Sequence, residues 1–240
     1  MFGLKVAFSL GGQIMNFVTS YSGGKDSALA LCRMIEQGHN PVALITTINS
    51  EQKRSWFHGI QNELLFAVSR SLNIPMIFCE SNQDNYIQVF EQSLDKALKM
   101  GADACVFGDI DIEEHKLWNE ERCEKVGLKL VLPLWQEKRE TLVREMLAKN
   151  FKAVIKIIDS NLDISFLGQD LTDLLIDKIK ATGADPCGEN GEYHTFVYDG
   201  PIFTYPVLFE KGKIIDFGTH KAIDIINTNL QIKKTPRGQD

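Results

Sequence analysis

The sequence predicts an α/β fold: a parallel sheet with helices on both faces, followed by a smaller α/β domain at the C-terminal end. Two observations carry this prediction. Between residues 17 and 181, strand-like and helix-like runs alternate with short turns, which indicates right-handed strand-helix-strand crossovers. After residue 181 the alternation stops and a long irregular stretch begins, so the chain changes its organisation there.

The first strand and the first helix are joined by the stretch YSGGKDSALAL, residues 21–31. Residues 17–19 before it read as a short strand. Apolar side chains then recur at helical spacing, at Ala28, Leu31, Cys32 and Ile35. Gly38 is expected to end this helix, because glycine readily adopts the positive φ found at a helix C-terminus. The stretch is therefore predicted to be a strand-to-helix turn.

The following segments complete the predicted parallel sheet. Asn73 and Pro75 separate a helix from the strand after it, and Gly101 and Gly127 each follow a helical pattern. Strands are expected at residues 42–47, 76–79, 104–107 and 129–132, and helices at residues 60–72, 84–100 and 113–126.

The second domain is predicted to begin near Leu132, which divides the chain into residues 1–132 and 133–240. A helix is expected at 137–149, a strand at 153–158 and a helix at 170–181. Residues 182–201 are rich in Gly, Pro and acidic residues and are expected to form a long irregular loop. Such loops in compact domains are usually functional or disordered.

The two ends of the chain complete the prediction. Residues 202–209 and 213–218 are expected to pair as a β-hairpin through residues 210–212. The polar tail from Thr228 is expected to fray. Residues 2–12 precede the first strand, have no clear partner and are expected to be dispensable.

Composition excludes several classes of protein. The 240 residues are 44% hydrophobic, enough for a real core, and carry a net charge of -6 with 26 basic and 32 acidic side chains. This balance does not favour nucleic acid or an anionic membrane as partner. No apolar run is long enough to span a membrane, no signal peptide is evident, and the five scattered cysteines include no C-x-x-C pair. These features indicate a cytoplasmic protein.

The turn has the chemistry of a phosphate site. The carboxyl ends of parallel strands collect ligands, and the helix that begins there presents unpaired N–H groups. The residues expected to bind an anion are Ser22, Gly23, Gly24, Lys25, Asp26 and Ser27. Because Asp26 would repel a bare phosphate, its presence predicts a nucleotide together with Mg²⁺, with Asp26 as the metal ligand. The spacing fits neither a Walker A loop nor a dinucleotide fingerprint.

As a unit, SGGKDS resembles the PP-loop of the ATP pyrophosphatase superfamily, whose members cleave ATP between the α and β phosphates and adenylate a substrate. The resemblance implies a Rossmann-like fold of the adenine nucleotide alpha hydrolase type. It also implies that the loop holds pyrophosphate, with Lys25 neutralising its charge, and that adenine meets the backbone of the second strand at Leu44, Ile45 and Thr46.

A second motif narrows the resemblance. The run CGENGEYHTFV from Cys187 to Val197, followed by Asp199 and Pro201, is similar to a signature of the diphthine-ammonia ligase family. Gly108 and Asp109, and the stretch PLW at residues 133–135, are also similar to the middle of that family. The chain departs from the archaeal and eukaryotic ligases at residues 113–118 and looks closer to bacterial-type members. The resemblance therefore implies the fold and the ATP site but not the acceptor.

Within the long loop, Glu189 and Glu192 are candidates to bind an amine-bearing acceptor, to ligate Mg²⁺ or to act as a base. The alternative is that these carboxylates belong to an acidic, solvent-exposed loop without a functional role. His194 is a candidate base or hydrogen-bond donor, with capping of the following strand as the alternative. Cys187 has no basic partner in the sequence and is expected to be inert.

Other candidates lie outside that loop. His58 matches a histidine that the family places early in its second helix, where it either approaches the phosphates or caps the helix. Asp109 and Asp111 follow a strand and are expected at the ligand-facing edge. Packing is favoured over ligand stacking for Trp118 and Trp135, and Lys138 and Arg139 are interpreted as a solvated helix start.

The sequence thus favours an ATP-dependent ligase that adenylates an acceptor carboxylate, releases pyrophosphate and then forms an amide with ammonia or an amine. Two alternatives stay open: an adenine-nucleotide sensor without turnover and an RNA-modifying PP-loop enzyme. The identity of the acceptor, a small molecule or a protein, and the oligomeric state, a homodimer included, are not readable from the sequence.

Overall fold

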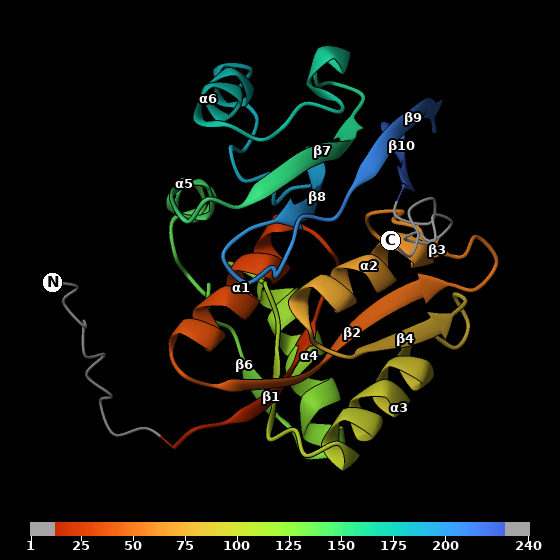
Figure 1. Ribbon diagram of the computed structural model, residues 1–240, viewed down its shortest axis with the longest axis vertical. Helices are drawn as coiled ribbons and strands as arrows, with labels where there is room; N and C mark the ends of the chain where they lie inside the picture. The colour runs from red at the N-terminus through yellow and green to blue at the C-terminus, as the bar shows by residue number, and fades with distance from the viewer. Residues whose placement is uncertain (1–12, 229–240) are drawn as a thin grey trace, which may run out of the picture.

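The computed structural model describes residues 13–228, and Figure 1 shows two sheets with two helices between them. The segment of residues 2–12, expected to be dispensable, and the tail beyond residue 228 fall outside the described residues. None of the helices within residues 13–228 is long and apolar enough to cross a membrane.

The first sheet confirms the predicted parallel α/β fold. Its strands are β1 (Asn16–Ser20), β2 (Asn40–Asn49), β3 (Arg54–Ser55), β4 (Met76–Ser81), β5 (Ala104–Val106) and β6 (Lys129–Val131). β4 pairs with β2, and the order continues through β1 and β5 to β6; all of these pairs are parallel. The two-residue β3 is antiparallel to the end of β2. β1 therefore lies between β2 and β5, where the order of the strands reverses.

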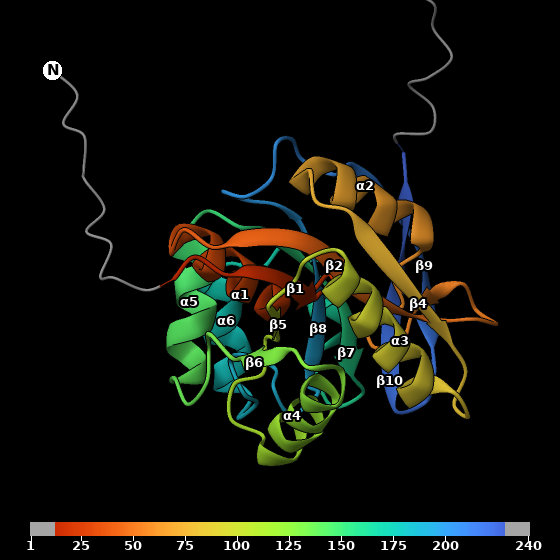
Figure 2. The same ribbon diagram turned by 90° about the horizontal axis from the view of Figure 1, so that it is seen from below.

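Helices cover both faces of this sheet, as expected. They are α1 (Lys25–Glu36), α2 (Asn62–Leu72), α3 (Tyr86–Lys99) and α4 (Glu113–Val126). Buried side chains of α1 and α2 pack in one apolar cluster, and those of α3 and α4 pack in a second cluster. Figure 2 shows α2 and α3 on opposite sides of β4.

The second sheet is antiparallel and comes from the C-terminal part of the chain. In spatial order its strands are β8 (Tyr193–Asp199), β7 (Lys152–Asp159), β10 (His220–Asn227) and β9 (Phe209–Asp216). Three further helical segments accompany it: α5 (Arg139–Ala148), the single 3-10 turn η1 (Ile164–Phe166) and α6 (Asp173–Ala181).

Two predicted features of this half are wrong. The irregular stretch expected at 182–201 contains strand β8, whose central side chains are buried against β7. The expected hairpin is displaced, because β9 runs through residues 210–212 without turning and pairs with β10. The true turn follows Asp216, where Gly218 has a φ of +84°. Gly212, interpreted as the turn, lies inside a strand.

The two sheets share one apolar core. A single cluster of buried residues contains side chains from α1 and α2 and also from β7 and β8, such as Leu29, Leu65, Ile155 and Phe196. The second sheet is therefore packed against the face of the first sheet that α1 and α2 cover, and it reaches the end of β1 where the glycine-rich turn lies.

Candidate functional site

A cavity of about 400 Å³ lies beyond the carboxyl ends of β1 and β5. This is the point where strand order reverses, the usual ligand site of an open parallel sheet. The first half of the chain lines it with the glycine-rich turn, the end of β5 and parts of α3 and α4, and the second half adds residues 188–195. The predicted site residues that line it are Ser22, Lys25, Asp26, Ser27, His58, Gly108, Asp109, Glu189 and His194.

The glycine-rich turn has the form of an anion site. Gly24 precedes α1 in an extended conformation and, because it has no side chain, does not cap the helix itself. The Gly24 N–H donates to Ser22 Oγ at 3.2 Å, and Ser27 Oγ donates to the Gly24 carbonyl at 3.0 Å. The two serine hydroxyls lie 3.2 Å apart on the cavity wall. A helix N-terminus with hydroxyls beside it favours bound phosphate.

Three glycines allow the close packing that forms this turn. Gly23 has a φ of +86°, and a Cβ there would lie 2.6 Å from Ile60. A Cβ on Gly24 would lie 2.4 Å from the His58 ring, and one on Gly108 would lie 2.7 Å from the backbone of Asp26. Gly23 and Gly24 thus shape the turn from behind the cavity wall, and Gly108 brings the end of β5 against it.

Lys25 and Asp26 form an ion pair at the start of α1, with Nζ 2.7 Å from Oδ2. Lys25 is only 5% exposed, and its ammonium also lies over the Tyr193 ring, 5.4 Å from the centroid. Burial opposes the charge of Lys25, but the neighbouring Asp26 carboxylate outweighs it and holds the pKa of Lys25 well above its usual value. Lys25 is therefore a permanent cation beside the glycine-rich turn.

Cys187 lies next to this pair. Its thiol donates to Asp26 Oδ1 at 3.7 Å, and burial raises the pKa of the thiol far above its usual value. The thiol stays protonated at neutral pH, which fits the expectation that Cys187 is inert.

Strand β8 is joined directly to the glycine-rich turn. Thr195 Oγ1 accepts the Lys25 N–H at 3.0 Å, and the Val197 N–H donates to the Gly23 carbonyl at 2.9 Å. The Thr195 carbonyl accepts from His58 Nδ1 at 2.9 Å. The turn is thus held in place by a strand that lies about 170 residues further along the chain.

His58 and His194 form an edge-to-face pair with ring centroids 4.9 Å apart. Burial, the neighbouring His194 and Lys25 hold the pKa of His58 well below its usual value. Burial and Lys25 likewise lower the pKa of His194 to about 4. Both rings are therefore neutral at physiological pH. Because a carbonyl can only accept, His58 carries its proton on Nδ1, and its Nε2 is an acceptor.

The two candidate glutamates have different surroundings. Glu189 lines the cavity, and burial together with Asp26 and Asp109 raises its pKa to about 7. Glu192 lies outside the residues that line the cavity, and its carboxylate accepts from the backbone N–H groups of Asp185 and Asn190, each at 3.0 Å. The structure thus places Glu189 with the glycine-rich turn and commits the Glu192 carboxylate to the loop itself.

The two aspartates after β5 also differ. Asp109 lines the cavity and accepts from Asn119 Nδ2 at 2.8 Å and His115 Nδ1 at 3.1 Å, and burial raises its pKa. Asp111 is not on the cavity wall; it pairs with Arg139, whose hydrogen bonds lower the pKa of Asp111. Arg139 is thus no solvated helix start, and its role could not be read from local sequence.

The residues expected to meet adenine lie elsewhere. Leu44, Ile45 and Thr46 are buried in β2 and are not among the residues that line the cavity. Thr46 Oγ1 donates to the Tyr21 carbonyl at 2.6 Å. The cavity instead has an aromatic wall that the sequence did not single out as a binding surface, formed by Phe57, Tyr86, Phe90, Phe107 and Trp118. Of these five residues, only Trp118 is a candidate for ligand stacking in the sequence, and no local pattern marks the other four.

Metal ligation rests on few side chains. Within residues 13–228, no group of three or more His, Cys, Asp or Glu side chains is arranged to hold a metal ion. A Mg²⁺ that arrives with a nucleotide needs only one or two carboxylates, because phosphates and water supply the other ligands. Asp26, at the start of α1 and on the cavity wall, suits that part.

Comparisons with known proteins match both halves of the chain to one family. A family model described as the diphthamide synthase N-terminal domain matches residues 15–130, and one described as the C-terminal domain matches residues 138–232. The human diphthine-ammonia ligase is 27% identical over 227 residues, covering 84% of this chain and 85% of the relative. The Schizosaccharomyces pombe ligase is 26% identical over 243 residues, covering 91% of this chain and 40% of that longer relative.

Among solved structures, a predicted subunit of tRNA methyltransferase from Methanocaldococcus jannaschii superposes with a TM-score of 0.43 and 17% identity, covering 81% of this chain and all of that one. The family assignment rests on the two domain models, which match in order and together span most of the chain. With the glycine-rich turn and the loop of residues 187–197 on one cavity, this chain belongs to the diphthine-ammonia ligase family of PP-loop proteins.

Proposed function

We propose that this protein is an ATP-dependent ligase that forms an amide from an acceptor carboxylate and ammonia or an amine, with release of AMP and pyrophosphate. One observation carries the proposal: the phosphate-binding turn with Lys25 and the acidic loop with Glu189 line one cavity, although 164 residues separate the two side chains in the sequence numbering. The names of the relatives support it, since they are diphthine-ammonia ligases.

The first half of the reaction is a displacement at the α-phosphate. A carboxylate oxygen of the acceptor attacks the α-phosphorus, and the bond to the bridging oxygen breaks with release of pyrophosphate. Ser22, Ser27 and the N-terminus of α1 would hold the β and γ phosphates, and Lys25 would balance the charge of the leaving group. Positioning and charge, more than covalent chemistry, then determine the rate.

Asp26 would hold Mg²⁺ in this site, and the metal would supply further charge neutralisation to the leaving pyrophosphate.

The second half uses an amine. The nitrogen attacks the carbonyl carbon of the acyl-adenylate, AMP leaves and the nitrogen loses a proton. Glu189 lies on the cavity wall with a pKa of about 7, so near neutral pH it is ionised in part and can accept that proton. Asp26 and Asp109 add negative charge on the same wall, which attracts ammonium or a cationic amine. His194, with its pKa lowered to about 4, is too weak a base to accept this proton near neutral pH and would act through hydrogen bonds.

A turnover assay tests the proposal. Purified protein is incubated with ATP, Mg²⁺, ammonium and a panel of carboxylate acceptors, diphthine-bearing protein among them, and AMP and pyrophosphate are quantified. We expect both products in equal amounts, dependent on acceptor. Release of ADP, or ATP binding with no turnover for any acceptor, would contradict an AMP-forming ligase and favour a nucleotide sensor.

A single substitution tests the location of the nucleotide. Gly24→Val would place a branched side chain where even a Cβ lies 2.4 Å from the His58 ring, so the turn cannot keep its shape. We expect ATP affinity to fall more than about tenfold, or at least 1.4 kcal/mol, in a protein that remains folded by circular dichroism. Gly38→Ala is a control for a strained glycine replacement away from the cavity, because Gly38 has a φ of +86° but open space around it, and it should leave ATP affinity unchanged.

A further inference from the structure

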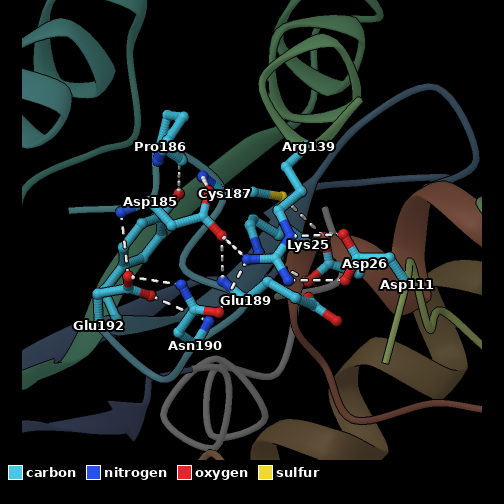
Figure 3. A network of polar contacts seen from close by, with 11 residues as sticks. Lys25, Asp26, Asp111, Arg139, Asp185, Pro186, Cys187, Glu189, Asn190 and Glu192 are labelled. Carbon is cyan, nitrogen blue, oxygen red and sulfur yellow. Dashed lines mark hydrogen bonds and ion pairs between the residues drawn. The ribbon is translucent and has the colours of Figure 1, made fainter. Parts of the chain in front are cut away.

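Arg139 joins three segments that are far apart in the sequence (Figure 3). Its guanidinium makes two hydrogen bonds to Asp111 in the segment between β5 and α4, at 2.7 and 2.8 Å. The same group donates to Asp185 Oδ2 at 2.7 Å and to Asn190 Oδ1 at 2.9 Å. One side chain therefore ties the end of the nucleotide-binding sheet to the loop of residues 185–192.

This arginine stands at an unfavourable place for helix stability. Arg139 is the first residue of α5, Lys138 precedes it, and no side chain caps the helix. A cation near a helix N-terminus is repelled by the helix dipole. Only Glu140 supplies an acidic side chain to this first turn. The position makes sense through the long-range partners of Arg139, since α5 itself gains nothing from the charge.

Asp185, the partner of Arg139 in the loop, also binds the backbone of the loop. Its side chain is 7% exposed, and it accepts the backbone N–H groups of Cys187 at 2.9 Å and Glu189 at 3.1 Å. Arg139 is the cation that balances this buried carboxylate. Without it, the buried Asp185 carboxylate would lose the cation that balances it, and its hold on the Glu189 backbone would loosen.

We propose that Arg139 is a positioning residue: by clamping Asp185 and Asn190 to Asp111, it fixes the loop of residues 185–192 over the glycine-rich turn and so holds the Glu189 carboxylate in the cavity. The proposal rests on the function proposed above for Glu189. It makes no claim that Arg139 touches substrate.

The clamp also affects the charge of Glu189. The charged groups that act on Glu189 are Lys25 and Asp26 from the start of α1, Asp109 from the end of β5, and Arg139 from α5. Asp26 and Asp109 raise the pKa of Glu189, and Lys25 and Arg139 lower it. Removing the Arg139 charge should therefore move the midpoint of Glu189 upward and shift any activity that depends on its ionised form to higher pH.

The experiment compares Arg139→Gln, Arg139→Lys and Arg144→Gln in the full chain. Arg144 lies on the same helix and also pairs with three carboxylates, Glu140, Asp173 and Asp177, but it makes no recorded contact with the loop. It is a matched control for loss of an arginine from α5. Two readouts need no turnover: amide hydrogen exchange of residues 187–190, and ¹³C NMR titration of carboxyl-labelled glutamate, with Glu189 assigned from the Glu189→Gln spectrum.

In Arg139→Gln we expect exchange of the Cys187 and Glu189 amides to quicken about tenfold or more. We also expect the Glu189 midpoint to rise, because Arg139 is one of the charges that lower its pKa. Arg139→Lys keeps the charge and loses the planar fork, so the midpoint should stay near that of wild type while exchange quickens. Arg144→Gln should change neither. If Arg139→Gln does not fold, the lysine variant still decides whether the fork holds the loop.

Unchanged exchange at residues 187–190 in both Arg139 variants would overturn the proposal. Once an acceptor is known, the glutamine variant should lose about tenfold or more in kcat with ATP affinity within about threefold. A wild-type protein that neither binds ATP nor releases AMP would refute the proposed ligase function, while the exchange and titration results would still decide the role of Arg139.

Discussion

At the scale of single residues, the Glu189 carboxylate lowers the stability of the fold near neutral pH, because it is partly buried in the cavity beside Asp26 and Asp109. Burial, Asp26 and Asp109 raise its pKa from 4.5 to about 7, so the folded protein binds a proton more tightly than the unfolded chain does. Stability from this group is present at low pH and is lost as pH rises through the folded value. A site that needs an ionised carboxylate at this position therefore has it at the expense of stability of the fold.

Glu189→Gln should therefore stabilise the protein at high pH. We expect a gain of about 1–2 kcal/mol in the free energy of unfolding near pH 8, discounted from the full shift because the side chain keeps contact with solvent. Near pH 5 the gain should be small. Urea unfolding at the two pH values measures both. Glu192→Gln is the contrasting variant: it should lose about 1 kcal/mol, because two backbone N–H groups lose a charged acceptor. A gain from Glu189→Gln that is equal at both pH values would contradict the raised pKa.

At the scale of elements, β8 determines the shape of the glycine-rich turn. Thr195 is 1% exposed, its hydroxyl accepts the Lys25 N–H, and its carbonyl accepts from His58. Thr195→Val keeps the shape but leaves the Lys25 N–H without an acceptor, which costs about 1–3 kcal/mol. We expect that loss in the free energy of unfolding, and faster hydrogen exchange of the Lys25 amide.

Thr195→Ser is the control, because it retains the hydroxyl and loses only a methyl group. The Lys25 amide should then stay as protected as in wild type. Protection of this amide that survives in Thr195→Val would show that the link from β8 does not hold the turn.

The elements also show what the sequence could predict. In the first sheet β1, β2 and β5 are largely buried and α1 to α4 each end near a Gly or Asn, so local signals were sufficient for the parallel strands and their helices. The two-residue β3 is not predicted by any local pattern. In β9 most side chains are exposed, and Lys, Glu and Gly interrupt the alternation of apolar and polar residues. The sequence therefore predicts a turn at residues 210–212, where the strand in fact continues. β8 was hidden because it follows directly on a loop rich in Gly and acidic residues.

The candidate site divides in the same way. The glycine-rich turn could be predicted from residue types, because phosphate chemistry is local to a strand-to-helix turn. Placing Glu189 in the site relied on resemblance, since only the fold brings residue 189 to residue 25. Arg139 and the aromatic wall had no signal, because their partners lie many residues away: Asp111 is 28 residues from Arg139 and Asp185 is 46.

At the scale of the whole molecule, the two halves share one core although the sequence predicts two domains. The cluster that contains side chains of α1 and α2 also contains side chains of β7 and β8. Arg33 of α1 donates to Glu137, just before α5, and to Glu145 within α5. The cavity too is complete only when residues 188–195 meet the glycine-rich turn. The boundary near Leu132 remains a prediction about sequence organisation; the packing indicates that neither half keeps its core without the other.

We therefore predict that the full chain unfolds in a single cooperative transition, even though chains of this length often populate intermediates. Scanning calorimetry should give one peak with a ratio of calorimetric to van't Hoff enthalpy near one. A fragment of residues 13–132 would expose the apolar faces of α1 and α2 that now pack against β7 and β8, and it should lack a cooperative transition. Two resolved peaks, or a fragment that melts cooperatively, would mean that the halves are independent domains. In that case the cavity would form by docking, and ATP would be expected to stabilise both halves by bringing them together.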